Sequence, residues 1–204
     1  MEKLTYNDTD LESESKYELI NGVLSGEPRY ELIGGVKFIM SPALNLNHGT
    51  IINRIMNIFI NYILNNDVKA AAFSDNTDVY FSKEEHYMPD ISIVCNPELL
   101  KSRKRIEGAP DLIVEVLSES TMKNDLGKKK DIYERYGVKE YWIVDPWSKR
   151  IDVYHLIEGR FQFNDVYKYH GNDDEGIETP QEIKVSIFND LVVDIRNVFK
   201  WWFE

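Results

Sequence analysis

A single glutamate, Glu115, lies in the middle of the apolar run DLIVEVL at residues 111–117. The run is short, rich in aliphatic residues, and bounded by Gly-Ala-Pro and Ser-Glu-Ser-Thr, a pattern that predicts a buried strand. Side chains alternate between the two faces of a strand, so Glu115 shares a face with Ile113 and Leu117. Burying an ionised carboxylate between such neighbours is costly unless a cation compensates it. The run therefore predicts either a strand whose glutamate reaches solvent, or a functional carboxylate paired with a cation.

The segments around this run predict alternating helices and strands. Residues 46–65 carry apolar side chains at helical spacing, and residues 121–136 predict a second helix that ends at Gly137. Strands are expected at residues 17–20, from 30 through 40, and at 70–81, 88–95, 111–117, 140–145, 151–156 and 158–169, with a turn at 83–87. The C-terminal residues 186–203 are expected to form an apolar strand or helix that docks on the core. This order predicts an α/β fold with a mixed sheet and helices on both sides.

The length of 204 residues predicts one domain. Residues 1–29 are acidic and polar and are expected to form a partly ordered N-terminal extension, with residues 30–204 as a single domain. The formal net charge of −11 excludes a protein that coats nucleic acid nonspecifically, but not an enzyme that acts on nucleic acid at one face. Basic residues gather at 101–105 and 128–130, on either side of the Glu115 strand. Such runs are usually solvated surface; the alternative is contact with nucleic acid.

Several function classes lack their sequence signatures. No strand is followed by a glycine-rich phosphate loop, and neither an HExxH motif nor a serine nucleophile elbow occurs. The single cysteine, Cys95, excludes an intramolecular disulfide and a cysteine-rich zinc site. No apolar stretch is long enough to span a membrane, and the first residues do not form a signal peptide. We therefore expect no membrane partner and a cytoplasmic location.

Two consecutive predicted strands each carry one acid. Asp90 follows Pro89 at the start of the strand ISIVC, and Glu115 lies inside the next strand. If these strands pair in one sheet, the two carboxylates come close together. Mg²⁺ is commonly held by one or two carboxylates together with water and substrate phosphate. The pair therefore predicts a magnesium site that can activate water and neutralise charge on a phosphoryl oxygen.

The following helix offers a cation. Asp125, Lys129 and Tyr133 are spaced four residues apart and share one helix face. If that face turns towards the sheet, Lys129 points at Glu115. The alternative is a surface lysine in an ordinary ion pair with Asp125, and surface pairs of this kind are common and weak.

The motifs in this order resemble a known family. MPDISIV, GAPDLIVEVLSEST, the pattern D-x-x-x-K-x-x-x-Y and GVKEYWIVDP are similar to those of the Uma-two family, a restriction-endonuclease-like group within the PD-(D/E)XK nuclease superfamily. YELIGGVKFIMSP followed by His48 fits the family's N-terminal pattern. The resemblance covers residues 30 to 160. It implies a restriction-endonuclease-like mixed central sheet flanked by helices, with extra antiparallel strands.

The resemblance also implies roles for individual residues. Asp90 would be the first metal ligand, Glu115 the second, and the backbone carbonyl of Val116 a further ligand, for Mg²⁺ with Mn²⁺ as the alternative metal. The parent motif places its lysine two residues after the acid, where this chain has Leu117. The resemblance implies that Lys129 takes over this catalytic role. The residues expected near the site in second rank are Glu31, His48, Asp125 and Tyr133.

Three hypotheses for the function follow. The first is a metal-dependent endonuclease that hydrolyses DNA phosphodiester bonds, and the resemblance implies that such enzymes often act as homodimers. The second is a catalytically inactive module on the nuclease fold that binds nucleic acid or protein, which the displaced lysine and the negative charge favour. The third is a structural or interaction protein that uses Trp201 and Trp202 as a dimer contact.

Overall fold

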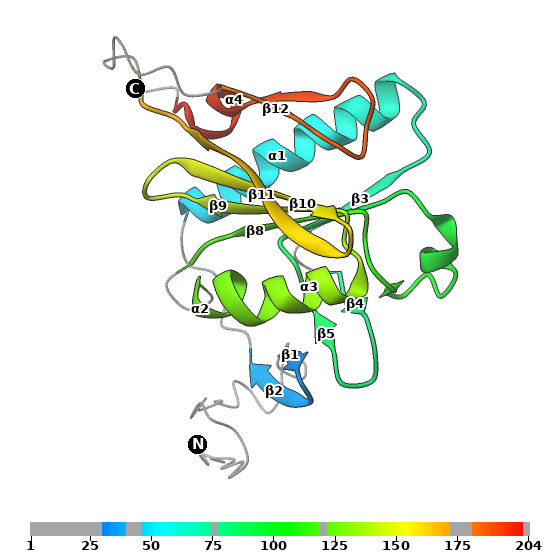
Figure 1. The fold of residues 1–204 in the computed structure, drawn as a ribbon. Helices are drawn as coiled ribbons and strands as arrows, with labels where there is room; N and C mark the ends of the chain where they lie inside the picture. Colours follow the sequence, from blue (N-terminus) through cyan, green and yellow to red (C-terminus); the bar gives the residue numbers. More distant parts are fainter. Residues whose placement is uncertain (1–29, 40–45, 75–76, 119–121, 172–180, 202–204) are drawn as a thin grey trace, which may run out of the picture.

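The computed structural model describes residues 30–39, 46–74, 77–118, 122–171 and 181–201 (Figure 1). The predicted N-terminal extension at residues 1–29, including the strand expected at 17–20, lies outside the described residues. The assignment of residues 30–204 to one domain stays a prediction.

A six-stranded sheet forms the centre of the protein. Its strands are β3 (Ala71–Ser74), β6 (Ile91–Val94), β8 (Leu112–Val116), β9 (Glu140–Asp145), β10 (Arg150–Ile157) and β11 (Arg160–Lys168). They lie in the order β11-β10-β9-β8-β6-β3. β8 and β9 are parallel, and the other neighbouring pairs are antiparallel. The mixed sheet predicted from the sequence is confirmed.

Helices cover both faces of this sheet (Figure 1). α1 (Leu46–Asn65) has the predicted bounds and buries one apolar side, including Ile55 and Phe59, against one face. The other face is covered by α2 (Met122–Asn124), the π-helical turn η2 (Asp125–Lys129) and α3 (Lys130–Tyr136). α3 ends at Gly137, whose φ of 87° is left-handed, as the sequence predicts. No helix within the described ranges is long and apolar enough to cross a membrane.

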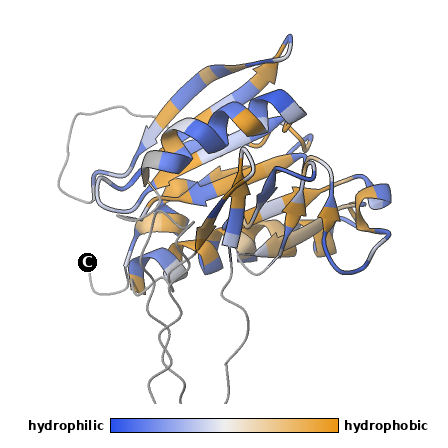
Figure 2. Ribbon diagram, turned by 90° about the horizontal axis from the view of Figure 1, so that it is seen from below, coloured by the Kyte–Doolittle hydropathy of each residue, from blue (hydrophilic) through white to orange (hydrophobic). Residues whose placement is uncertain are grey.

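The alternation of side chains along β8 decides what each face of the sheet contains. Leu112, Val114 and Val116 pack on the α1 side, whereas Ile113 and Leu117 pack on the α3 side. Glu115 therefore belongs to the Ile113 face, as expected from the period of two. Figure 2 shows the central strands as largely hydrophobic, whereas the helix in front of them carries both hydrophilic and hydrophobic residues.

A second, smaller sheet lies on the α3 side (Figure 1). Its strands are β1 (Tyr30–Ile33), β2 (Val36–Ile39), β4 (Val79–Tyr80), β5 (His86–Tyr87) and β7 (Ile106–Glu107), and the short helix η1 (Pro97–Leu100) precedes β7. The order is β2-β1-β5-β4-β7. Gly34 and Gly35, with φ of 61° and 77°, form the tight turn between β1 and β2. Tyr87 of this sheet packs with Tyr133 of α3, which joins the two layers.

Two expectations for this region were wrong. The predicted strand at residues 70–81 is divided into β3 in the central sheet and β4 in the small sheet. The last two residues of the predicted turn at 83–87, His86 and Tyr87, form the strand β5. β4 and β5 have two residues each and form because they pair with other strands, as in the pair of Leu32 with His86. A strand that short has no detectable hydrophobic period of its own.

The C-terminal segment docks on the core, as expected. β12 (Glu182–Lys184) pairs with β13 (Val192–Asp194), and α4 (Ile195–Phe199) packs against α1. Glu140 of β9, which is fully buried, anchors this segment. Its carboxylate accepts hydrogen bonds from Trp142 Nε1 at 2.6 Å, from the Ser186 backbone N–H at 2.6 Å and from Ser186 Oγ at 2.5 Å. Three donors thus satisfy this buried carboxyl group.

Replacing Glu140 by alanine should lower the free energy of unfolding by about 2–4 kcal/mol, because buried donors would lose their acceptor. Urea unfolding followed by circular dichroism measures this change. The matched control is Glu182→Ala in the exposed part of β12, which should stay within about 0.5 kcal/mol of the wild type. Equal stability of the two variants would show that Glu140 does not anchor the segment.

Candidate active site

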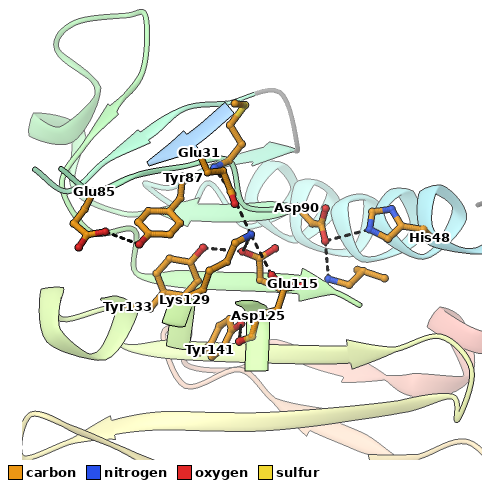
Figure 3. Close-up of polar contacts among 12 residues, drawn as sticks. Glu31, His48, Glu85, Tyr87, Asp90, Glu115, Asp125, Lys129, Tyr133 and Tyr141 are labelled. Atoms are coloured by element: carbon orange, nitrogen blue, oxygen red, sulfur yellow. Dashed lines mark hydrogen bonds and ion pairs between the residues drawn. The ribbon is translucent and has the colours of Figure 1, made fainter. Parts of the chain in front are cut away.

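Lys129 is the centre of a buried ionic cluster (Figure 3). Its side chain is 2% exposed, and its Nζ lies 3.0 Å from Glu31 Oε1, 3.1 Å from Glu115 Oε1 and 3.1 Å from Asp125 Oδ1. The first acid comes from β1, the second from β8 and the third from η2. Lys129 therefore connects the small sheet, the central sheet and the helical segment that covers it. The prediction that this lysine faces Glu115 is confirmed.

The helix that carries Lys129 departs from regular α geometry at the site. Residues Asp125–Lys129 form a π turn, and Gly127 lies in its middle. Such widened turns occur frequently at functional sites. Asp125, Lys129 and Tyr133 still face the sheet together, and the hydroxyl of Tyr141 donates to the Asp125 carbonyl at 3.0 Å. The sequence predicts the helix here, but its spacing did not predict the π turn.

Glu115 uses one carboxylate oxygen for all its described contacts. Oε1 lies 3.1 Å from Lys129 Nζ and accepts a hydrogen bond from the Tyr133 hydroxyl at 2.7 Å. Burial raises the pKa of Glu115 well above its usual range; Lys129 opposes this rise, and neighbouring carboxylates add to it. Burial and the Glu115 carboxylate likewise raise the pKa of Tyr133 well above its usual value, so the phenol remains a hydrogen-bond donor.

Asp90 directly precedes the first residue of β6 and lies beside Glu115. The last paired residues of β6 and β8 are Ile91 and Val114, so the register places Asp90 opposite Glu115. Asp90 Oδ2 accepts a hydrogen bond from the Val116 backbone N–H at 2.7 Å. His48, in the first turn of α1, brings its Nε2 to 3.3 Å from the same oxygen. The Asp90 side chain is 15% exposed, compared with 3% for Glu115, so the cluster opens to solvent on the Asp90 side.

The cluster holds more negative than positive groups. Among the described residues, four carboxylates gather around one lysine; they belong to Glu31, Asp90, Glu115 and Asp125. Burial lowers the pKa of Lys129, but these carboxylates, above all Glu115, raise it well above its usual value, so the lysine stays charged. One ammonium group cannot balance four carboxylates in a buried site. The arrangement favours either protonation of Glu115 or binding of a further cation.

The oxygen donors near Asp90 fit a magnesium ion. Within the described ranges, no three His, Cys, Asp or Glu side chains form a ready metal-ligand set. Mg²⁺ needs fewer protein ligands than three, because it keeps several waters and commonly takes one or two carboxylates. The described contacts leave Asp90 Oδ1 and Glu115 Oε2 to other ligands. The Val116 carbonyl points to the Asp90 side, because the N–H and carbonyl of one strand residue face the same neighbour.

Two buried tyrosines near the cluster were not among the residues predicted from the sequence. Tyr87 and Tyr141 both stack edge-on against Tyr133, with ring centroids 5.6 Å and 5.3 Å apart. The Tyr87 hydroxyl donates to Glu85 Oε2 at 2.6 Å. Tyr141 could have been found, because its position in β9 is opposite Ile113, on the face of Glu115. Tyr87 carries no such signal, since β5 has only two residues.

The two basic runs differ in position. In the run 128–130, Lys129 is buried, whereas Lys128 is exposed over the Phe38 ring and Lys130 lies over the Tyr154 ring. In the run 101–105, all residues but Ser102 are exposed, as solvated surface would be, and Arg105 pairs with Glu107. One run therefore contributes to the candidate site and the other lies on the surface.

Comparison with known proteins places the chain in a family. The family described as Uma2, "Putative restriction endonuclease", matches residues 16–184. The chain belongs to this family. The resemblance inferred from the PD and EVLSEST motifs is thus confirmed, and the matched region contains every predicted site residue.

Two further comparisons agree with this assignment. The protein slr1290 of Synechocystis sp. (strain ATCC 27184 / PCC 6803 / Kazusa) is 34% identical over 110 residues, which cover 53% of this chain and 57% of that protein. The alignment thus spans just over half the length of this relative. The crystal structure of "a putative nuclease belonging to DUF820" from Anabaena variabilis ATCC 29413 superposes with a TM-score of 0.64 at 22% identity, covering 88% of this chain and 94% of that chain. The predicted fold class is confirmed by this similarity.

The substitution Lys129→Met should destabilise the metal-free protein by about 3–5 kcal/mol at neutral pH, because it leaves buried carboxylates without their cation. Glu115 binds its proton more tightly in the folded protein than in the unfolded chain, so falling pH adds stability until the unfolded carboxyl is also protonated. Without the lysine this pKa rises further. The free energy of unfolding of Lys129→Met should therefore lie closer to that of the wild type at about pH 5 than at about pH 7.5.

Urea unfolding at both pH values measures this difference. Lys128→Met, at the exposed neighbouring position, is the matched control and should change stability by less than about 0.5 kcal/mol at either pH. A Lys129→Met protein as stable as the wild type at neutral pH would contradict the charge balance described for the cluster.

Proposed function

We propose that this protein is a metal-dependent endonuclease that hydrolyses DNA phosphodiester bonds. The observation that carries the proposal is the buried cluster in which Lys129 contacts three carboxylates, while Asp90 lies opposite one of them, Glu115, just before β6. Membership of a restriction-endonuclease-like family supports the same reaction class. Mg²⁺ is the expected metal, and Mn²⁺ can replace it because it prefers similar oxygen ligands.

In this proposal Asp90, Glu115 and the Val116 carbonyl hold the metal. A bound Mg²⁺ supplies an activated water and neutralises charge on a phosphoryl oxygen. The residues around the acids orient them. Lys129 holds Glu115 through Oε1, which leaves Oε2 for the metal. In the same way the Val116 N–H holds Asp90 through Oδ2 and leaves Oδ1.

Further side chains keep this arrangement in place. Tyr133 donates to Glu115 and His48 contacts Asp90, so each proposed ligand has a second contact that restricts its rotation. Ile113 and Leu117, which are 0% and 5% exposed, exclude water from the sheet side of Glu115. Lys129 also supplies positive charge beside the acid, which is the role of the lysine in the parent motif. Preorganised charge in a site that excludes water is the main source of electrostatic catalysis.

One observation favours a second candidate function. Lys129 is 2% exposed and already contacts three carboxylates, so it reaches a phosphate only if these contacts rearrange. A catalytically inactive module that binds nucleic acid or protein needs no such rearrangement. The same cluster would then stabilise the fold. Cleavage assays separate the two candidates.

The first experiment is cleavage of supercoiled plasmid and branched DNA with Mg²⁺ or Mn²⁺. Wild-type protein should nick the substrate only with metal, and Asp90→Ala and Glu115→Ala should each reduce the rate by at least about 100-fold, because each removes a metal ligand. Asp111→Ala, which removes an acid bound to Lys139 outside the cluster, is the control and should retain activity if it folds. Metal-independent nicking, or nicking that survives in Glu115→Ala, would contradict the proposal.

Metal binding should release a proton and should strengthen as the pH rises. The pKa of Glu115 is raised in the folded protein, and a carboxyl must lose its proton before it can bind a metal. Calorimetric titration with Mn²⁺ in buffers of different ionisation enthalpy measures the released proton. Glu115→Gln should abolish both the binding and the proton release. Binding that is independent of pH, or unchanged in this variant, would place the metal elsewhere.

A further inference from the structure

A pocket of about 410 Å³ lies outside the carboxylate cluster and has no role in the proposed hydrolysis. Its lining includes Asn47 of α1, Trp147 and Lys149 of the turn between β9 and β10, and Phe199 and Trp201 at the end of α4. Three aromatic residues, an asparagine and a lysine therefore border one space. Its volume falls within the range of small-molecule sites.

The pocket and the acids lie at the same edge of the central sheet. β8 and β9 are parallel, and their last paired residues are Val116 and Val144. Glu115 lies near the end of β8, Asp90 lies opposite it just before β6, and the turn with Trp147 follows the end of β9 directly. α1 also begins at this edge (Figure 1). Its residue Asn47 lines the pocket, and the next residue, His48, contacts Asp90.

Hydrogen bonds hold both aromatic walls of the pocket in place. On one side, Asp145 accepts from the backbone N–H of Trp147 at 2.9 Å and from Ser148 Oγ at 2.6 Å, which fixes the turn. On the other side, Arg54 of α1 donates to the carbonyls of Val198 and Lys200 at 3.0 and 2.7 Å. Its guanidinium group also lies 5.3 Å from the centroid of the Trp201 ring. The rings are thus presented by a rigid frame.

The chemistry of the pocket fits a nucleobase next to a phosphate. Aromatic side chains stack with any base, since every base has a π-face. Trp147 is half exposed, so its indole is accessible to such a ring. Lys149, whose Nζ lies 5.3 Å from the centroid of the Tyr169 ring, carries a positive charge next to the pocket, and the N-terminus of α1 favours anions as well.

We infer that this pocket binds an unpaired nucleobase of a single-stranded DNA end or flap beside the scissile phosphate. The inference rests on the proposed nuclease function and adds a preference in substrate form to it. A base within a duplex is stacked on both sides and cannot enter an aromatic pocket without leaving the stack. Bases at an overhang or a flap are free to enter. The enzyme should therefore prefer junctions between duplex and single strand over blunt duplex.

The test uses a duplex with a short overhang that contains 2-aminopurine, and a blunt duplex of the same sequence. Ca²⁺ replaces Mg²⁺, so that binding is measured by fluorescence anisotropy without cleavage. Wild-type protein should bind the overhang more tightly and quench the 2-aminopurine. Trp147→Ala should weaken overhang binding about 5- to 100-fold, the usual effect of losing one stacking partner, with blunt duplex binding unchanged. Trp147→Phe should retain most of the affinity.

Two further variants complete the design. Phe163 of β11 is 54% exposed, about as much as Trp147. Phe163→Ala therefore removes a comparable aromatic ring outside the pocket and should leave binding unchanged. Lys149→Gln should weaken binding of both duplexes and reduce the salt slope by about one, as expected for a phosphate contact. Trp147 is chosen over Trp201 for the main variant because it is more exposed, so its loss should not disturb the core.

The outcomes distinguish this inference from the proposed function. Equal affinity for overhang and blunt duplex, or no effect of Trp147→Ala on the overhang, overturns the inference and leaves the nuclease proposal standing if the wild type cleaves. Overhang binding with 2-aminopurine quenching, but without cleavage by the wild type, supports the pocket and overturns the nuclease proposal. Asp90→Ala should lose cleavage but retain the quenching, which separates the two sites within one protein.

Discussion

The buried ammonium group of Lys129 is the contact on which the candidate site depends. Glu31, Glu115 and Asp125 come from three different elements, β1, β8 and η2, and the Lys129 ammonium group lies between them. Apolar packing alone would not bring three carboxylates together, since each loses hydration on burial. The aromatic rings of Tyr87, Tyr133 and Tyr141 enclose the same space. The small sheet, the central sheet and the α2–α3 segment are therefore joined by one ionic cluster within an aromatic shell.

The cluster also contains more carboxylates than positive groups, which the stability of the fold alone does not require. Sequences that specify a fold usually agree with local rules, and departures from those rules gather at functional sites. Here a carboxylate interrupts an apolar strand, and a π turn interrupts the helix that faces it. Each departure has a cost that the surrounding packing must offset. Both departures meet at Glu115 and Lys129, which supports a functional reading of the cluster over a purely structural one.

The parallel pair β8–β9 organises the rest of the functional edge. Two parallel strands end at the same side of a sheet, and open α/β sheets commonly bind their ligands there. Glu115 lies near the end of β8 with Asp90 opposite it, and the aromatic pocket with Trp147 follows the end of β9. α1 begins at the same edge and contributes His48 to one site and Asn47 to the other. The parallel pair thus places the acids and the pocket at one edge of the sheet, with Glu115 on the α3 face and the pocket on the α1 face.

Features with a local period or a motif can be predicted from the order of the amino acids. The bounds of α1, the end of α3 at Gly137 and the face of Glu115 follow from spacing within one segment. The contact of Lys129 with Glu115 was one of two interpretations that the sequence left open, and the packing of η2 on the central sheet decides it. The small sheet, the π turn, and the positions of Tyr87 and Trp201 also depend on tertiary contacts. Strands of two residues and side chains at chain ends have no period of their own, because pairing and packing with distant segments place them.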